Sequence, residues 1–101
     1  MQTRTRGMGG DPDAQRVEIA ATSVHATVQL ESNTCREKGL TDTIAGSVKT
    51  GHSEIEGTGR PKEALYYYNI ALQSKTSEGT CALIFSDGMR HATVNVRIVK
   101  P

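Results

Sequence analysis

A histidine and two glutamates alternate in the stretch His52-Ser53-Glu54-Ile55-Glu56. Successive side chains of a β-strand point to opposite faces, so His52, Glu54 and Glu56 would project together from one face. Ile55 would then point into the core. One imidazole and two carboxylates suit a divalent metal ion. The pattern also fits a solvated strand face, and we favour that interpretation because the sequence holds no second histidine nearby.

Three consecutive tyrosines, Tyr66, Tyr67 and Tyr68, could form a platform on which a sugar or a peptide stacks. Strand alternation places Tyr66 and Tyr68 in the core and leaves Tyr67 exposed. One exposed ring is a small platform, so carbohydrate binding is an alternative and not the leading hypothesis.

Two further stretches invite a phosphate-binding or a catalytic interpretation. Residues 57–62 read GTGRPK, but no helix follows to hold an anion, and Pro61 suits a bent connector. Cys81 and His91 could form a nucleophile pair across a hairpin. Cys81, however, shares a face with core residues and is expected to be buried and crosslinked. We therefore predict no enzymatic activity, no catalytic residue, no metal and no cofactor.

The elements that must position these groups are strands, because apolar and polar residues alternate along most of the chain. Asp87-Gly88 is a favoured pair for a tight hairpin turn, and it separates the last two runs. We predict an all-β, immunoglobulin-like sandwich of about seven antiparallel strands. The predicted strands are 16–21, 24–31, 43–49, 52–57, 64–74, 80–86 and 91–99. The side chains expected to point inward are Val17, Ile19, Ala21, Val24, Ala26, Val28, Leu30, Ile44, Val48, Ile55, Tyr66, Tyr68, Ile70, Leu72, Cys81, Leu83, Phe85, Ala92, Val94, Val96 and Ile98.

The domain is expected to span residues 16–101. Residues 1–15 have almost no apolar content, and they contain Gly7, Gly9, Gly10 and Pro12, which disfavour regular helices and strands. We therefore expect a flexible N-terminal segment there. The 101 residues suffice for one small core, and that core must be modest because the chain has no Trp and a single Phe.

The charge balance excludes some classes of partner. Twelve basic and eleven acidic residues give a formal net charge of +1, and the signs alternate along the chain. Nucleic-acid binders usually gather a basic excess on one face, so no nucleic-acid partner is expected. No apolar stretch is long enough for a transmembrane segment, and the first residues lack the apolar region of a secretory signal.

The two cysteines bear on the compartment. Cys35 follows one predicted strand and Cys81 opens another, which suits one buried disulfide; two buried free thiols are the alternative. Neither a CxxC motif nor paired histidines accompany them, so a metal site is not expected. A disulfide implies an oxidising, extracytoplasmic compartment, secreted, periplasmic or surface-exposed. The chain would then be a mature or excised part of an exported protein.

The last quarter of the chain, GTCALIFSDGMRHATVNVRIVKP, resembles the closing strands of bacterial immunoglobulin-like modules. The matching positions are Gly79, Thr80, Cys81, Leu83, Phe85, Asp87, Gly88, Val94, Val96 and Ile98. The chain departs from antibody-type domains, which have a core Trp and a Tyr two residues before the second Cys; here Gly79 stands in that place. The resemblance implies a stalk, spacer or adhesive module of a surface or secreted protein.

These observations lead to one expected function and two alternatives. We expect a non-enzymatic structural or adhesive binding module with a protein or glycan partner, bound at the loops 87–90 or 57–62. One alternative is a small carbohydrate- or metal-binding domain that uses Tyr67, or Glu54 and Glu56. The other is a cytosolic protein of mobile-element or phage origin with free thiols at Cys35 and Cys81.

Overall fold

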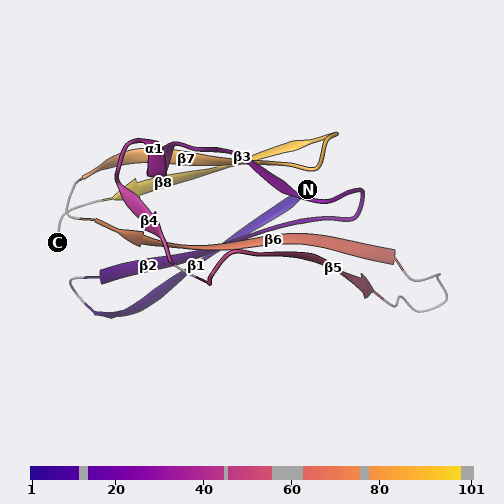
Figure 1. Cartoon of the computed structure of the whole chain (residues 1–101), viewed down its shortest axis with the longest axis horizontal. Coiled ribbons are helices and arrows are strands. Elements are labelled where there is room, and N and C mark those ends of the chain that lie inside the picture. The colour runs from indigo at the N-terminus through magenta and orange to yellow at the C-terminus, as the bar shows by residue number, and fades with distance from the viewer. Residues whose placement is uncertain (12–13, 45, 56–62, 76–77, 99–101) are drawn as a thin grey trace.

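The computed structural model describes residues 1–11, 14–44, 46–55, 63–75 and 78–98 (Figure 1). In these residues the chain forms eight strands and one short helix. They are β1 (Gln2–Asp11), β2 (Ala14–Ser23), β3 (Gln29–Asn33), α1 (Thr34–Glu37), β4 (Thr41–Thr43), β5 (Lys49–Ile55), β6 (Glu63–Ser74), β7 (Gly79–Ser86) and β8 (His91–Ile98). No helix among the described residues has the length and apolarity needed to cross a bilayer.

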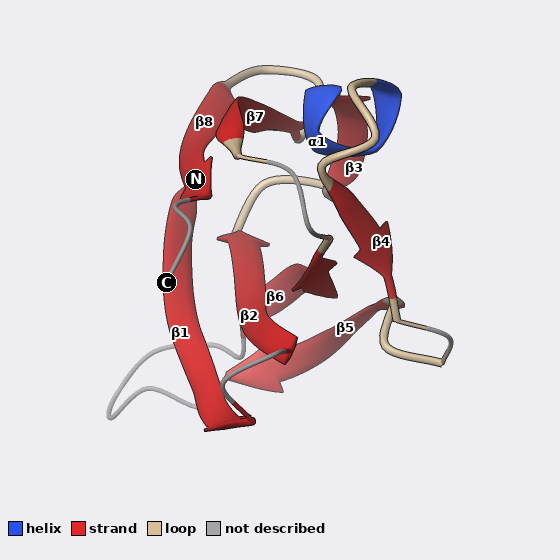
Figure 2. Ribbon diagram, turned by 90° about the vertical axis from the view of Figure 1, so that its left-hand side faces the viewer, coloured by secondary structure: helices blue, strands red, loops and turns tan. Residues whose placement is uncertain are grey.

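Two antiparallel sheets build the molecule. The larger sheet has the order β1-β2-β6-β4, with β5 also paired to β6, and the smaller sheet has the order β3-β7-β8 (Figure 2). A constant-type immunoglobulin sandwich has the orders A-B-E-D and C-F-G. The described strands follow the same orders, with β4 and β5 sharing the place of strand D. The predicted all-β sandwich is therefore confirmed, with one strand more than expected.

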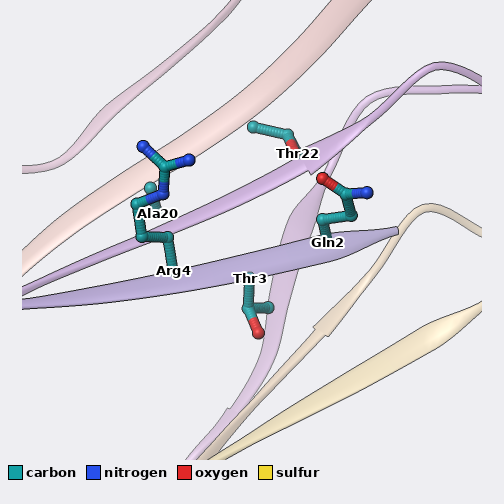
Figure 3. A pocket seen from close by; sticks show the side chains of 5 residues that line it. All are labelled: Gln2, Thr3, Arg4, Ala20 and Thr22. Carbon is teal, nitrogen blue, oxygen red and sulfur yellow. The ribbon is translucent and has the colours of Figure 1, made fainter.

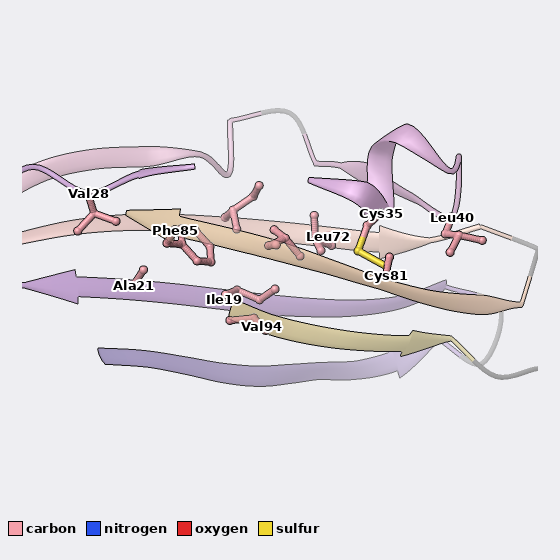
Figure 4. Close-up of a cluster of buried hydrophobic side chains, with 11 residues drawn as sticks. Ile19, Ala21, Val28, Cys35, Leu40, Leu72, Cys81, Phe85 and Val94 are labelled. Atoms are coloured by element: carbon pink, nitrogen blue, oxygen red, sulfur yellow. A yellow bond between two sulfur atoms is a disulfide. The ribbon is translucent and has the colours of Figure 1, made fainter. Parts of the chain in front are cut away.

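The sheets enclose a core of aliphatic side chains around the single phenylalanine, Phe85, which is fully buried (Figure 4). The alternation predicted for β2, β6, β7 and β8 is confirmed. Tyr66 and Tyr68 pack against this core, and the ring centroids of Tyr68 and Phe85 are 5.8 Å apart. The buried hydrophobic side chains of the cluster are Ile19, Ala21, Val28, Cys35, Leu40, Ile70, Leu72, Cys81, Leu83, Phe85 and Val94.

Residues 2–11, which we expected to belong to a flexible N-terminal segment, form strand β1. β1 pairs with β2 in antiparallel register from Gln2 opposite Thr22 to Met8 opposite Arg16, with an irregularity between Met8 and Asp11. Backbone hydrogen bonds need no apolar side chain, so an edge strand can form from a polar stretch. The low apolar content of residues 1–15 was therefore a poor guide to their backbone.

The single strand predicted over 24–31 is wrong. β2 ends at Ser23, the chain crosses to the other sheet, and β3 begins at Gln29. Val28 is buried as expected, but the side chain of Val24 is 52% exposed. The backbone N–H of His25 donates a 3.1 Å hydrogen bond to the Ser23 hydroxyl, and this local bond turns the chain away from the ladder.

The strand predicted over 43–49 is also wrong in its limits. β4 stops at Thr43, Gly46 has a positive φ of 76°, and β5 starts at Lys49, so the described residues between these strands belong to no strand. A positive φ is readily adopted only by glycine. Val48, expected in the core, is 43% exposed because it lies outside the ladder.

β5 confirms the strand predicted near residue 52 but reverses its faces. His52 opposes Tyr66, whose side chain packs on the core, while Ile55 opposes Glu63 and is 40% exposed. A shift of one residue in register exchanges the two faces of a strand. The pairing with β6 sets the register of β5, and the tendency of the single isoleucine to be buried does not override it.

The disulfide predicted between Cys35 and Cys81 is present and buried, with Cα atoms 4.8 Å apart. It joins α1 to β7, whereas the disulfide of antibody domains joins strands B and F. The Thr34 hydroxyl supports the same contact, because it donates to the Ala82 carbonyl at 3.1 Å and accepts from the Ala82 N–H at 2.7 Å. Asn33 caps the helix by accepting from the Arg36 N–H.

Candidate functional site

The β7–β8 hairpin ends in a four-residue loop, from Asp87 to Arg90, as the Asp-Gly pair predicts. Gly88 has a φ of 88°, which the turn requires and glycine supplies. Within the loop, Oδ1 of Asp87 accepts from the N–H groups of Met89 at 2.9 Å and Arg90 at 2.7 Å. The carboxylate therefore fixes the backbone of the loop from inside.

Asp87 also connects this loop to the crossing between β2 and β3. The Ser23 hydroxyl donates a 2.7 Å hydrogen bond to Oδ2 of Asp87, and both residues are buried. The N–H of His25 donates to the same Ser23 oxygen. One buried carboxylate thus joins the loops 24–28 and 87–90, which lie at the same end of the sandwich (Figure 1).

The electrostatics of Asp87 follow from these bonds. The hydroxyl of Ser23 and the backbone N–H groups of Arg90 and Met89 favour the charged carboxylate and hold its pKa far below the ordinary value. Burial acts in the opposite direction and is the weaker effect. Asp87 is therefore ionised near neutral pH and serves as a structural anchor between the loops 24–28 and 87–90.

Two large apolar side chains are exposed on these joined loops. Val24 is 52% exposed and Met89 is 75% exposed. His25 and Arg90 are exposed beside them in sequence. We call the exposed residues of 24–28 and 87–90 the loop end. Its backbone is fixed by hydrogen bonds while its apolar side chains face solvent, which is an arrangement suited to contact with another molecule.

The structure describes two of the three groups that could have formed a metal site. His52 and Glu54 are exposed on β5, and Glu56 lies outside the described residues. The ring of His52 contacts that of Tyr66, with centroids 5.8 Å apart. In the part of the chain that the structure describes, no three metal-ligating side chains converge.

The other predicted sites have mixed outcomes. The candidate loop 57–62 lies outside the described residues. Cys81 is disulfide-bonded and so has no thiol to pair with His91. The Nε2 atom of His91 instead lies 3.0 Å from a carboxylate oxygen of Glu31 on the solvent side of the smaller sheet.

Tyr67 lies on the outer face of the larger sheet, as alternation predicts, but it is half-buried. Its ring reaches from β6 across Gly51 of β5. A Cβ atom built on Gly51 would lie 2.9 Å from the Tyr67 hydroxyl oxygen. The missing side chain at Gly51 therefore makes room for the ring.

Sequence reasoning missed Ser23, which has the central position at the loop end. A signal for it exists: Ser23 follows Ile19 and Ala21 at the same inward parity, and a buried hydroxyl needs a hydrogen-bond partner.

Comparison of the chain with known protein families, curated proteins and solved structures gave no match.

Proposed function

We propose that the chain is a non-enzymatic binding module of a secreted or surface-exposed protein, and that its partner is a protein that contacts the loop end. The observation that carries this proposal is the hydrogen bond between Ser23 and Asp87. It fixes two loops relative to each other while leaving Val24 and Met89 exposed. Preformed loops lose little conformational entropy on binding, and exposed apolar side chains supply contact area.

The proposed compartment rests on the disulfide. Cys35 and Cys81 are joined and buried, and such bonds persist in oxidising compartments. Alkylation of producing cells lysed directly into denaturant with the alkylating agent and no reductant, so that buried thiols are also accessible, tests this point. We expect two unreactive cysteines. Two readily alkylated thiols would contradict the extracytoplasmic assignment and favour the cytosolic alternative.

Site-specific photocrosslinking tests the loop end as a binding surface. A benzoylphenylalanine replaces Met89 in the producing cell, and the matched control replaces Arg97, an exposed residue near the far end of β8. We expect a discrete crosslinked protein adduct from position 89 that is missing from position 97. Equal crosslinking from both positions, or none from position 89, would contradict the proposal.

A further inference from the structure

Directly opposed residues on four neighbouring strands form a row across the larger sheet. Arg4 of β1 opposes Ala20 of β2. Ala20 opposes Asn69 of β6, and Asn69 opposes Lys49 of β5. Opposed residues of antiparallel strands share a face. Because the neighbouring Ala21 is buried in the core, this row lies on the outer face.

A second row lies beside the first. Gln2 opposes Thr22, Thr22 opposes Tyr67, and Tyr67 opposes Gly51. Residues two apart on a strand are about 7 Å apart, so the backbone positions of the two rows are about 7 Å apart along the strands. This row contributes a hydroxyl, a primary amide and an aromatic ring that crosses the sheet over Gly51.

The first row and the Gln2 and Thr22 end of the second row border a hollowed surface, which we call the outer-face groove; Tyr67 lies next to Thr22 in the second row, beside the hollows. One hollow of about 460 Å³ is lined by residues that include Gln2, Arg4 and Thr22. Another of about 440 Å³ is lined by residues that include Arg4, Lys49 and Asn69. Arg4 belongs to both, so the hollows adjoin. Figure 3 shows Gln2, Arg4 and Thr22 on the same side of the strands, with Thr3 pointing away.

The charge of the groove is positive. Arg4 and Lys49 are exposed, and among the described residues neither has a carboxylate within ion-pair distance. Glu18 is the one acidic residue among the described groove-lining side chains. Three strand spacings put the Cα atoms of Arg4 and Lys49 ~14 Å apart, with the small Ala20 and the amide of Asn69 between them.

We propose that the outer-face groove binds a carboxylate-bearing saccharide. A sugar ring would rest against Tyr67, and its hydroxyls would contact the side chains of Asn69 and Thr22. Carboxylates of the same sugar unit or of the next one would contact Lys49 and Arg4. An aromatic ring with convergent amides and hydroxyls suits a sugar. Arg4 and Lys49, which have no carboxylate partner among the described residues, select an acidic one. This site is distinct from the loop end.

Affinity electrophoresis tests the proposal with carboxylated polymers of three kinds, polygalacturonate, hyaluronate and polysialic acid, against the neutral polymer dextran. We expect the native protein to be retarded by at least one acidic polymer and not by dextran. Loss of either cation, in Arg4→Gln or Lys49→Gln, should weaken that binding about tenfold. Tyr67→Ala should weaken binding as well.

The matched control is the double variant Arg36→Gln/Arg97→Gln, which makes the same change in net charge as Arg4→Gln/Lys49→Gln but lies on α1 and β8. It should bind like the native protein, and so should Met89→Ala. Circular dichroism verifies that each variant is folded. If both double variants lose the same affinity for the acidic polymer, then net charge alone attracts the polymer and the proposed site is overturned. Binding to none of the acidic polymers, or equally to dextran, would also overturn it, and neither result would bear on the loop end.

Discussion

Ser23 and Asp87 are 64 residues apart in sequence, and the Ser23 hydroxyl donates a 2.7 Å hydrogen bond to the Asp87 carboxylate. The bond crosses from the larger sheet to the hairpin loop of the smaller one. It therefore does two things at once: it satisfies a buried carboxylate and it sets the relative position of the two loops that form the loop end.

Ser23→Ala should lower the free energy of unfolding by about 1 kcal/mol, because the Asp87 carboxylate stays in place with one donor fewer. Urea denaturation measures this loss. Ser53→Ala is the matched control, since Ser53 is exposed on β5 and should leave stability unchanged. Equal stability of the two variants would mean that the Ser23 bond contributes nothing net.

Acid should destabilise the native protein through Asp87. Its folded-state pKa is depressed, so its contribution to stability is present above the ordinary carboxyl pKa of about 3.9 and is lost as the pH falls below it. In Asp87→Asn this part of the acid sensitivity should disappear. Urea midpoints between about pH 5 and pH 2 measure the effect. Asp42→Asn, at an exposed carboxylate, is the control. If the urea midpoint falls with pH at the same slope in the native protein and in Asp87→Asn, the prediction is contradicted.

Reduction of the disulfide should lower stability by about 4 kcal/mol in the chain-entropy account of a crosslink between positions 46 residues apart. For a domain with one Phe and no Trp, this is a large share of the total. Urea unfolding with and without reductant measures the difference. The variant Cys35→Ala/Cys81→Ala should resemble the reduced protein and be insensitive to reductant. An unchanged midpoint on reduction of the native protein would contradict this account.

Gly51→Ala should stabilise the domain only when Tyr67 is absent. A glycine replaced at a compatible strand position normally gains about 0.5 kcal/mol by restricting the unfolded chain. With Tyr67 present the new methyl group meets its hydroxyl, so that gain should be cancelled or reversed. In a Tyr67→Ala background the gain should return. A double-mutant cycle followed by urea unfolding measures the coupling, and additive effects would show that the ring does not lie over Gly51 in solution.

The last two strands were the most predictable part of the fold. In β8 the inward series Val94, Val96 and Ile98 alternates with polar residues, and Asp87-Gly88 marks the turn before it. Local pattern and turn chemistry agree there, so register and faces follow from the sequence. The disulfide was predictable for a similar reason, since the inward parity of Cys81 could be read from its own strand.

The errors arose where distant pairing decides the structure. Val24 begins the apparent alternation of residues 24–31, yet the Ser23 hydrogen bond ends β2 before it and the next strand begins only at Gln29. Ile55 has no apolar neighbour of its own parity, so the register against β6 decides its face. The hairpin loop at 87–90 was predicted correctly, but the Ser23 that Asp87 bonds comes from a strand 64 residues earlier, and no local pattern encodes that meeting.

The position of the disulfide also determines how the domain would respond to a pulling force. Tension applied at the two ends of the chain passes through the bond between Cys35 and Cys81, which are 46 positions apart. The residues between the two cysteines therefore bear no tension. Full unravelling would then lengthen the oxidised chain to about 190 Å, against about 350 Å for the reduced one. Both loops of the loop end lie outside the crosslinked segment, so this tension would act on them while the residues between the two cysteines bear none.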